Sequence, residues 1–311
     1  MTCYITVDGG TTNTRVSLLD DGEVKDTVRI PLGAKANGEN RGVLDTAVKG
    51  AIKDILGRNG LMESDVAQIL AAGMVTSEMG LFPTAHIKAP AGIAELHKAI
   101  TRCTLPHITS IPFSFVTGVK TVGTLENTDL MRGEESELYG LFDTPPCNAV
   151  VILPGSHSKI IRTDEKGRIL SFQTMLTGEM LAALSSGTVL SQSIDLKEGV
   201  LDKTALLAGY SYAEAHGLNA ALFKVRVNRL SFGASHSEAY SFFLGAVLHG
   251  EIRAVLADCP KAVYIGGRAE IKEATATLLE ALASVSVFPL SDAAVNASTA
   301  KGLLKIYEYQ E

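Results

Sequence analysis

A turn rich in glycine and hydroxyl side chains lies near the start of the chain. It reads DGGTTNTR at residues 8–15 and follows an apolar run of strand length. Glycines let the backbone turn tightly and bring amide N–H groups close to a ligand, while hydroxyl, amide and guanidinium groups add donors. An aspartate at the end of the preceding strand is suited to hydrated Mg²⁺. The turn is therefore predicted to bind polyphosphate; the alternative is an ordinary β-turn. The predicted binding residues are Asp8, Gly10, Thr11, Thr12, Asn13 and Arg15, and Asp8 is also the predicted metal ligand.

A second turn offers the same chemistry. It reads LPGSHSK at residues 153–159 and again combines glycine, hydroxyls and a cation. Two such donor loops can hold the phosphates of a nucleotide from both sides. The acid occurs in one turn alone, since Leu153 stands where the first turn has Asp8, so the metal is expected mainly in the first half. The predicted nucleotide-binding residues of this turn are Gly155, Ser156, His157 and Lys159.

The two turns belong to an internal repeat. Residues 4–30 align with residues 149–175 without gaps at a constant offset of 145, which places Gly10 on Gly155 and Gly22 on Gly167. Each copy has an apolar strand pattern, the donor turn, a second strand, a Gly-containing turn and a third strand. The pattern predicts one meander of two β-hairpins in each half, with chance similarity as the alternative.

The elements after each meander are more helical. Helices are predicted over residues 44–56, 134–142, 238–256 and 269–283, and a last helix opened by Ser291 or Asp292. Strands are predicted over 68–72, 262–265 and 285–288. Alternation of strands and helices predicts an α/β protein of two similar layered domains with a cleft between them. Pro145-Pro146 marks the boundary, which gives domains at residues 1–144 and 145–311.

Two further segments could contribute to a site. In MRGEESE, at residues 131–137, a carboxylate of Glu134 or Glu135 could accept a hydroxyl proton during phosphoryl transfer, and Arg132 could bind an acidic substrate. The alternative is an acidic helix start stabilised by the helix dipole. The Gly266-Gly267-Arg268 turn could present a flat backbone surface to a base or ribose, although such a turn is often only a turn.

Composition excludes several classes of protein. The chain has 311 residues, a net charge of −6, four widely spaced cysteines and no run of about 18 apolar residues. We therefore expect no nucleic-acid partner, membrane span, structural zinc or secretory signal. We expect a cytoplasmic location. The P-loop, the Rossmann fingerprint and the protein-kinase motifs are missing.

Taken together, these segments resemble the actin-like ATPase superfamily of sugar kinases, hexokinase, actin and heat-shock ATPases. More narrowly, the chain is similar to the 2-dehydro-3-deoxygalactonokinase family. The segments that carry this resemblance run in order over nearly the whole chain: 72–77 (AGMVTS), 90–92 (PAG), 131–135 (MRGEE), 153–159 (LPGSHSK), 175–179 (MLTGE), 222–226 (LFKVR) and 244–246 (LGA).

The resemblance implies two ribonuclease-H-like domains with an interdomain cleft, and a kinase that uses ATP and Mg²⁺. Members transfer the γ-phosphoryl group to the O6 hydroxyl of 2-dehydro-3-deoxy-D-galactonate, a step of galactonate catabolism. It places Gly266 and Gly267 near adenosine. By analogy with exopolyphosphatases of the superfamily, Glu135 is preferred as the base and Glu134 is the second choice. The implied substrate-binding residues, beside Arg132, are Met74, Thr76, Ser77, Pro90, Ala91, Thr177 and Glu179.

Two departures bear on the substrate. The family usually has Asp-Trp-Gly at the first loop where this chain has Asp8-Gly9-Gly10, and its late turn is more often Gly-Thr-Ser. A kinase for another 2-keto-3-deoxy sugar acid therefore stays open, as do a phosphohydrolase of the exopolyphosphatase type and a homodimeric assembly. An acylating serine enzyme, suggested by Ser156-x-x-Lys159, and an ATP-switched binding protein are weaker alternatives.

Overall fold

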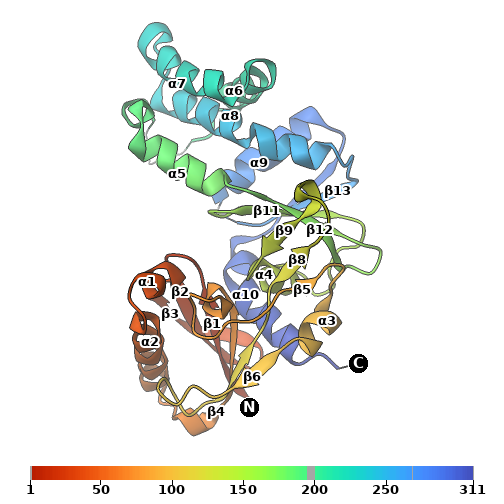
Figure 1. Ribbon diagram of the computed structural model, residues 1–311. Coiled ribbons are helices and arrows are strands. Elements are labelled where there is room, and N and C mark those ends of the chain that lie inside the picture. The colour runs from red at the N-terminus through yellow and green to blue at the C-terminus, as the bar shows by residue number, and fades with distance from the viewer. Residues whose placement is uncertain (1, 195–199, 268, 311) are drawn as a thin grey trace. The chain divides into compact units, whose positions relative to one another are not determined.

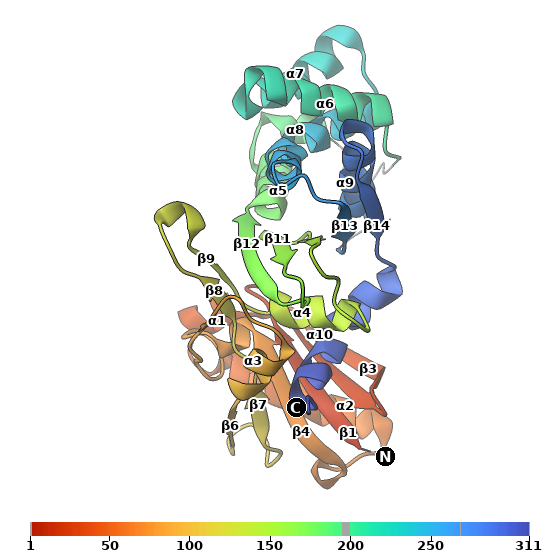
Figure 2. The same cartoon turned by 90° about the vertical axis from the view of Figure 1, so that its right-hand side faces the viewer.

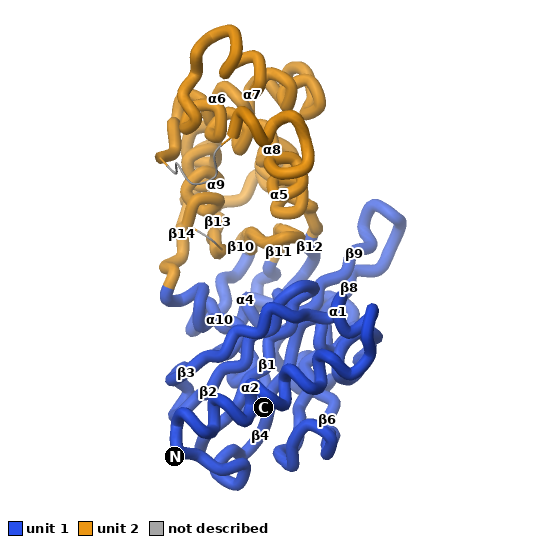
Figure 3. Tube along the Cα trace, turned by 90° about the vertical axis from the view of Figure 1, so that its left-hand side faces the viewer, with its two compact units in different colours: residues 1–148, 163–172, 293–311 blue, residues 149–162, 173–292 orange. Residues whose placement is uncertain are grey.

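The computed structural model describes residues 2–194, 200–267 and 269–310. Contacts divide the chain into two compact units, coloured in Figure 3. Unit 1 comprises residues 1–148, 163–172 and 293–311, and unit 2 comprises residues 149–162 and 173–292. The domain boundary predicted between residues 144 and 145 stays a prediction. The first segment of unit 1 ends four residues later, at residue 148, and unit 1 also includes most of the last helix.

A mixed six-stranded sheet forms the centre of unit 1, in the order β3-β2-β1-β4-β7-β6. Its first three strands make an antiparallel meander because short turns join them, and β4 then runs parallel to β1. β1 and β4 are buried over most of their length, as expected for central strands covered on both faces. The strands are β1 (Cys3–Gly9), β2 (Thr14–Asp20), β3 (Glu23–Ile30), β4 (Val66–Gly73), β6 (Thr101–Cys103) and β7 (Phe113–Phe115).

Helix α2 (Val43–Asn59) packs on β2 and β3 and buries an apolar stripe that includes Leu44, Val48, Ile52 and Ile55. It ends at Gly60, which has a φ of +66°. A small sheet in the order β5-β8-β9 completes the strands of this unit. The remaining short elements are α1 (Ala34–Glu39), η1 (Glu63–Asp65), η2 (Met74–Thr76), β5 (Ile87–Lys88), α3 (Ile93–Lys98), β8 (Val119–Thr121), η3 (Leu125–Asn127) and β9 (Asp129–Met131).

Two helices of unit 1, α4 (Glu134–Leu141) and α10 (Asp292–Tyr307), cross in direct backbone contact (Figure 2). A Cβ added to Gly140 would lie 1.7 Å from the carbonyl oxygen of Ser298, and one added to Gly302 would lie 1.8 Å from that of Ser136. No side chain fits at either glycine. The crossing therefore fixes α4, which carries the acidic segment singled out in the sequence.

The sheet of unit 2 repeats the strand order of unit 1. Its order is β12-β11-β10-β13-β14, with β10 and β11 antiparallel and β10, β13 and β14 parallel. The repeated meander predicted from the sequence is thus confirmed in each half of the chain. The strands are β10 (Val150–Leu153), β11 (Ser158–Thr163), β12 (Ile169–Met175), β13 (Ala262–Ile265) and β14 (Ser286–Pro289).

Helices α6, α7 and α8 stack on one another in unit 2 (Figure 1). The central helix α8 is buried over most of its length, and the hydroxyl of Ser235 caps its first turn. Within the described ranges, no helix is both long enough and apolar enough to cross a membrane. The helical elements are α5 (Thr177–Gly187), η4 (Val189–Gln192), α6 (Lys203–His216), α7 (Leu218–Phe232), α8 (His236–Leu256) and α9 (Ala269–Leu282).

Candidate active site

The first predicted phosphate loop joins β1 to β2 and rests on the start of α1. The amides of Ala34 and Lys35 donate to the carbonyl oxygens of Gly10 and Thr11 at 3.1 and 3.0 Å. In a trans peptide the following N–H points opposite to the carbonyl, so the amides of Thr11 and Thr12 point away from α1. The side chains of Thr11, Thr12 and Asn13 are exposed. The loop therefore presents amide and hydroxyl donors on one side, as an anion site requires.

The second predicted phosphate loop joins β10 to β11 and rests on the start of α5 in the same way. The amide of Glu179 donates to the carbonyl oxygen of Ser156 at 3.1 Å, so the amide of His157 points away from α5. Gly155 and Ser156 are exposed. The imidazole of His157 lies 3.0 Å from the Glu179 carboxylate, and Lys159 Nζ donates to Thr174 Oγ1 at 2.9 Å.

A glycine seats each loop on its helix. A Cβ on Gly33 would lie 2.5 Å from the carbonyl oxygen of Gly10, and a Cβ on Gly178 would lie 2.2 Å from that of Gly155. Gly33 and Gly178 lie 145 residues apart, as do Gly10 and Gly155, which is the offset of the sequence repeat. The repeat thus extends beyond the three strands to the contact that supports the loop, which sequence reasoning missed although both glycines stand in register.

The parallel strand after each meander also ends at a matching glycine. Gly73, after β4, has a φ of +79° and packs on Gly9, while Gly267, after β13, has a φ of +77° and packs on Pro154. Both positions require glycine because of the positive φ and the close backbone approach. Gly266 donates its amide to Ile152 at 2.9 Å. The late turn of unit 2 therefore lies beside the second loop; Arg268 lies outside the described residues.

Asp8 stands at the carboxyl end of β1, opposite Arg15 in the antiparallel register. Desolvation raises the pKa of Asp8, an effect that the nearby Arg15 cation opposes and the Glu134 carboxylate adds to. The hydroxyl of Thr299 in α10 also bonds to this carboxylate. The guanidinium of Arg15 donates to the carbonyl oxygen of Asn296 at 3.2 Å. Asp8 is therefore a carboxylate whose negative charge a cation would stabilise.

The two predicted catalytic glutamates differ in their surroundings. Glu135 has no exposed surface, and both its carboxylate oxygens accept from the Gly133 amide at 2.8 Å. Burial, with the neighbouring Glu134, raises the pKa of Glu135 to about 8. Glu134 is partly exposed and accepts from the Arg132 amide at 2.9 Å. Of the two predicted catalytic glutamates, Glu134 is the one whose charge acts on Asp8.

A third carboxylate, that of Glu137, was missed in the sequence. Burial raises the pKa of Glu137 to about 8, and the charges of Glu134 and Asp8 add to the shift while Arg15 opposes it. Glu134 and Glu137 are three residues apart and so share one face of α4. That spacing in the sequence was the available signal. Three acids around Arg15 therefore line this end of the unit 1 sheet.

Arg132 is bound within its own unit. Its guanidinium donates to the carbonyl oxygens of Thr76 (2.7 Å) and Thr84 (3.0 Å), and also to His86 Nδ1 (3.1 Å). Burial, followed by the Arg132 and Lys120 charges, lowers the pKa of His86 to about 4, so the ring is neutral and accepts at Nδ1. Arg132 therefore orders the loop that holds the predicted substrate residues. Several of its guanidinium N–H groups are already used within the protein.

The remaining predicted substrate residues differ in exposure. In the unit 1 loop, Met74 and Ser77 are partly exposed whereas Thr76 is fully buried. Pro90 is exposed, but Ala91 is fully buried and exchanges two backbone hydrogen bonds with Ile169. In unit 2, Glu179 is exposed and Thr177 is buried. Met74, Ser77, Pro90 and Glu179 are thus the ones with surface available to a small molecule.

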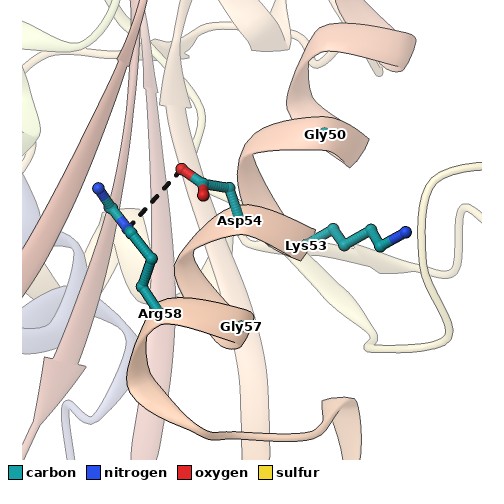
Figure 4. Close-up of a pocket in the computed structure, with 5 residues that line it drawn as sticks. All are labelled: Gly50, Lys53, Asp54, Gly57 and Arg58. Atoms are coloured by element: carbon teal, nitrogen blue, oxygen red, sulfur yellow. Dashed lines mark ion pairs between the residues drawn. The ribbon is translucent and has the colours of Figure 1, made fainter.

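A shallow depression elsewhere in unit 1 has no such chemistry. Gly50, Lys53, Asp54, Gly57 and Arg58 line it along the outer side of α2 (Figure 4). Two of the five lack side chains, and Arg58 Nε lies 3.7 Å from Asp54 Oδ2 in an exposed ion pair. The depression is the space that two glycines leave on a helix surface.

The donors described above fit a magnesium–nucleotide. Exposed loop amides suit phosphate oxygens, and the Asp8 carboxylate offers the hard oxygen ligand that Mg²⁺ prefers. In the part of the chain that the structure describes, no group of three or more His, Cys, Asp or Glu side chains is arranged to bind a metal by itself. A metal in this site would then depend on ligands beyond the protein, such as phosphate oxygens and water.

Comparisons with known proteins agree with this reading. A curated protein of Rhizobium meliloti (strain 1021) named "Probable 2-dehydro-3-deoxygalactonokinase DgoK1" is 26% identical over 261 residues, which are 82% of this chain and 80% of that protein. A crystal structure assigned to a 2-dehydro-3-deoxygalactonokinase protein from Sinorhizobium meliloti superposes with a TM-score of 0.78 at 23% identity, over 98% of this chain and 100% of that one.

The fold is shared more widely. Ligand-bound xylulose kinase from Lactobacillus acidophilus superposes with a TM-score of 0.53 at 9% identity, over 99% of this chain and 89% of that one.

The family model described as 2-keto-3-deoxy-galactonokinase matches residues 8–306 of the chain. The chain therefore belongs to the 2-keto-3-deoxy-galactonokinase family and is a sugar kinase with the actin-like ATPase fold.

Proposed function

We propose that the protein is a cytoplasmic enzyme of galactonate catabolism that transfers the γ-phosphoryl group of ATP to the O6 hydroxyl of 2-dehydro-3-deoxy-D-galactonate. The observation that carries the proposal is the pair of loops, one in each unit, that rest on a helix start through Gly33 and Gly178. Family membership supports the reaction class, and the name of the family supports the substrate.

The nucleotide contacts follow from the two loops. The amides of Thr11, Thr12 and His157 would bind phosphate oxygens, with the hydroxyls of Thr11, Thr12 and Ser156 as further donors. Asp8 would hold Mg²⁺, which supplies charge neutralisation on the phosphates when bound. The Gly266-Gly267 turn beside the second loop would face the adenosine. Lys159, held by Thr174, would add positive charge at the start of β11.

For the acceptor hydroxyl, the surroundings of the two glutamates favour Glu134 as the base. A base must reach the hydroxyl whose proton it accepts, and Glu134 is partly exposed and coupled to Asp8. Glu135 is fully buried and bound twice to the Gly133 amide, which suits the role of holding the start of α4. We therefore reverse the order preferred from the sequence, with Glu134 as base and Glu135 as support.

The sugar acid would contact the exposed members of the predicted set, Met74, Ser77, Pro90 and Glu179. Arg132 would act on substrate binding by ordering the Thr76–His86 loop through its hydrogen bonds. A partly exposed His86, neutral near pH 7, would leave its Nε2–H as a donor beside that loop.

A coupled assay of ADP formation tests the proposal. The purified protein is given Mg-ATP with 2-dehydro-3-deoxy-D-galactonate, related 2-keto-3-deoxy acids or neutral sugars, and phosphorylation at O6 is followed by ³¹P NMR. ADP should form only with a sugar acid present, and fastest with the galactonate derivative. Phosphate release that needs no acceptor would support a phosphohydrolase instead, and a preference for another acid would change the substrate.

A further inference from the structure

A buried carboxyl group lies beside the residues that flank the second predicted phosphate loop. Glu251 belongs to α8 and is 2% exposed. Its Oε2 accepts a hydrogen bond from the hydroxyl of Thr177 at 2.5 Å, and the hydroxyl of Ser158 lies beside the same carboxyl group. Thr177 and Ser158 are themselves 4% and 1% exposed. None of the three was singled out for this contact by the sequence.

The three side chains join the parts that hold the loop. Ser158 is the first residue of β11, directly after the loop at residues 154–157. Thr177 is the first residue of α5, whose Glu179 amide bonds to the loop carbonyl of Ser156. A side chain that binds both Ser158 and Thr177 would therefore hold the loop to the helix, in addition to the backbone bond from the Glu179 amide.

The protonation state of Glu251 follows from its neighbours. Glu251 Oε1 and Ser158 Oγ are both buried without a hydrogen-bond partner among the described residues. Because the Ser158 hydroxyl lies beside the Glu251 carboxyl group, each atom is the partner available to the other. Burial raises the pKa of Glu251, and the hydroxyls of Thr177 and Ser158 oppose the shift without any contribution from a cation. A buried carboxylate without a cation is costly, whereas a carboxylic acid can accept from Thr177 and donate to Ser158.

The described residues of unit 1 hold no equivalent of this group. At the offset of 145, Leu32 stands for Thr177 and Asn13 stands for Ser158, and neither takes part in such a contact. Instead the hydroxyl of Thr14 donates to the carbonyl oxygen of Leu32 at 2.8 Å. Glu251 is therefore a feature of the second half alone. In that half Leu153 stands at the position that corresponds to Asp8, so the second loop has no equivalent of the predicted metal ligand.

We infer that Glu251 is a positioning residue that, as a neutral carboxylic acid, binds Thr177 and Ser158 and so holds the second loop and the first turn of α5 together as one phosphate-binding platform. The choice of ATP as the ligand rests on the proposed function, whereas the contact itself does not depend on it. Without the acid, the loop amides would lose their fixed direction, and ATP would bind more weakly.

The test compares three variants with the wild type. Glu251→Gln can make both proposed hydrogen bonds, because its amide can accept from Thr177 and donate to Ser158, whereas Glu251→Leu keeps a similar volume and can make neither. Glu280→Leu, at an exposed site on α9, is the matched control. We expect the KM for ATP to rise at least tenfold in Glu251→Leu and less than threefold in the other two, with the KM for the sugar acid within twofold throughout.

Amide hydrogen exchange on the same proteins separates this inference from the proposed function. Exchange at residues 155–158 should be at least tenfold faster in Glu251→Leu than in Glu251→Gln, while exchange in β13 stays equal. If Glu251→Gln behaves like Glu251→Leu, the neutral-acid role is wrong. If neither variant alters loop exchange, the platform is wrong. Absence of kinase activity in the wild type would instead overturn the proposed function, and the exchange data would still decide the role of Glu251.

Discussion

Gly33 and Gly178 stand 145 residues apart and press against equivalent backbone atoms, the carbonyl oxygens of Gly10 and Gly155. In each unit the loop after the first strand and the helix after the third strand therefore meet without a side chain between them. The helix start then binds the loop carbonyls with its amides, which leaves the following loop amides directed outward. Each glycine thus supports a proposed phosphate-binding loop through backbone packing.

Replacing Gly178 by alanine should disrupt the second loop. The new Cβ would lie 2.2 Å from a backbone oxygen, which cannot move as a flexible side chain would. We expect the KM for ATP to rise at least tenfold and the sugar-acid KM to change little, measured by steady-state kinetics. Gly33→Ala should act in the same direction on the first loop.

Gly50→Ala is the matched control for these variants. Gly50 lies within α2 and has nothing within 4 Å of an added Cβ. Alanine should leave ATP binding unchanged and stabilise the protein by about 0.5–1 kcal/mol, as alanine does relative to glycine within a helix. Equal KM values for ATP in Gly178→Ala and Gly50→Ala would contradict the proposed seat of the loop.

Asp8→Asn should separate catalysis from stability. Loss of the carboxylate removes the proposed metal ligand, so kcat is expected to fall at least about 100-fold at saturating Mg-ATP. The thermal midpoint should stay equal or rise, because the ionised form of Asp8 is disfavoured by burial. Asp54→Asn on the outer side of α2 serves as control for the change in charge. Turnover close to the wild-type value would remove Asp8 from the mechanism.

Exchange of each glutamate for glutamine tests which of them acts as the base. Glu134→Gln should lower kcat about 10²–10⁴-fold, the range for loss of a general base, with an ATP KM within threefold of the wild type. Glu135→Gln should lower kcat less, because this side chain is buried and bonded to the Gly133 amide, and a glutamine oxygen can still accept that bond. The opposite order of kcat values would restore the preference drawn from the sequence.

The raised pKa values of Glu135 and Glu137 predict a stability that falls with pH. Both pKa values are about 8 in the folded protein against an ordinary value of 4.5, so folding favours the protonated forms. This stabilisation is full below about pH 4.5 and is lost as pH rises through about 8, by up to about 1.4 kcal/mol per pH unit for each group. Thermal midpoints from pH 5 to 9 should fall less in Glu137→Gln than in the wild type. Parallel curves would show that Glu137 titrates near its ordinary value.

The sequence predicts the framework of the fold well because its signals are local. The meander predicted at residues 4–30 and its copy at 149–175 appear as the strands β1–β3 and β10–β12, and the helix predicted over 44–56 is α2. Strand β13 was predicted over its observed residues. The strands β5, β8 and β9 have only two or three residues each, too few for any periodicity to appear.

The site was only partly predictable, since its contacts join residues far apart in the chain. The loops at Thr11 and Ser156 could be found from residue type and repetition. The bond from Thr177 to Glu251 crosses 74 residues, and a glutamate within an apolar helix gives no sign of its partner. The crossing of α4 and α10 at Gly140 and Gly302 likewise joins residues far apart in the chain, and no local pattern encodes it.

The most direct test of the account measures nucleotide binding by the two loops themselves. Titration calorimetry with Mg-ATP is performed on the wild type, on Gly33→Ala, on Gly178→Ala and on the double variant. If both loops grip one triphosphate, each single change should weaken binding at least tenfold, and the double variant should show no measurable binding. Wild-type affinity in either single variant would show that its loop does not hold the nucleotide and would contradict the account.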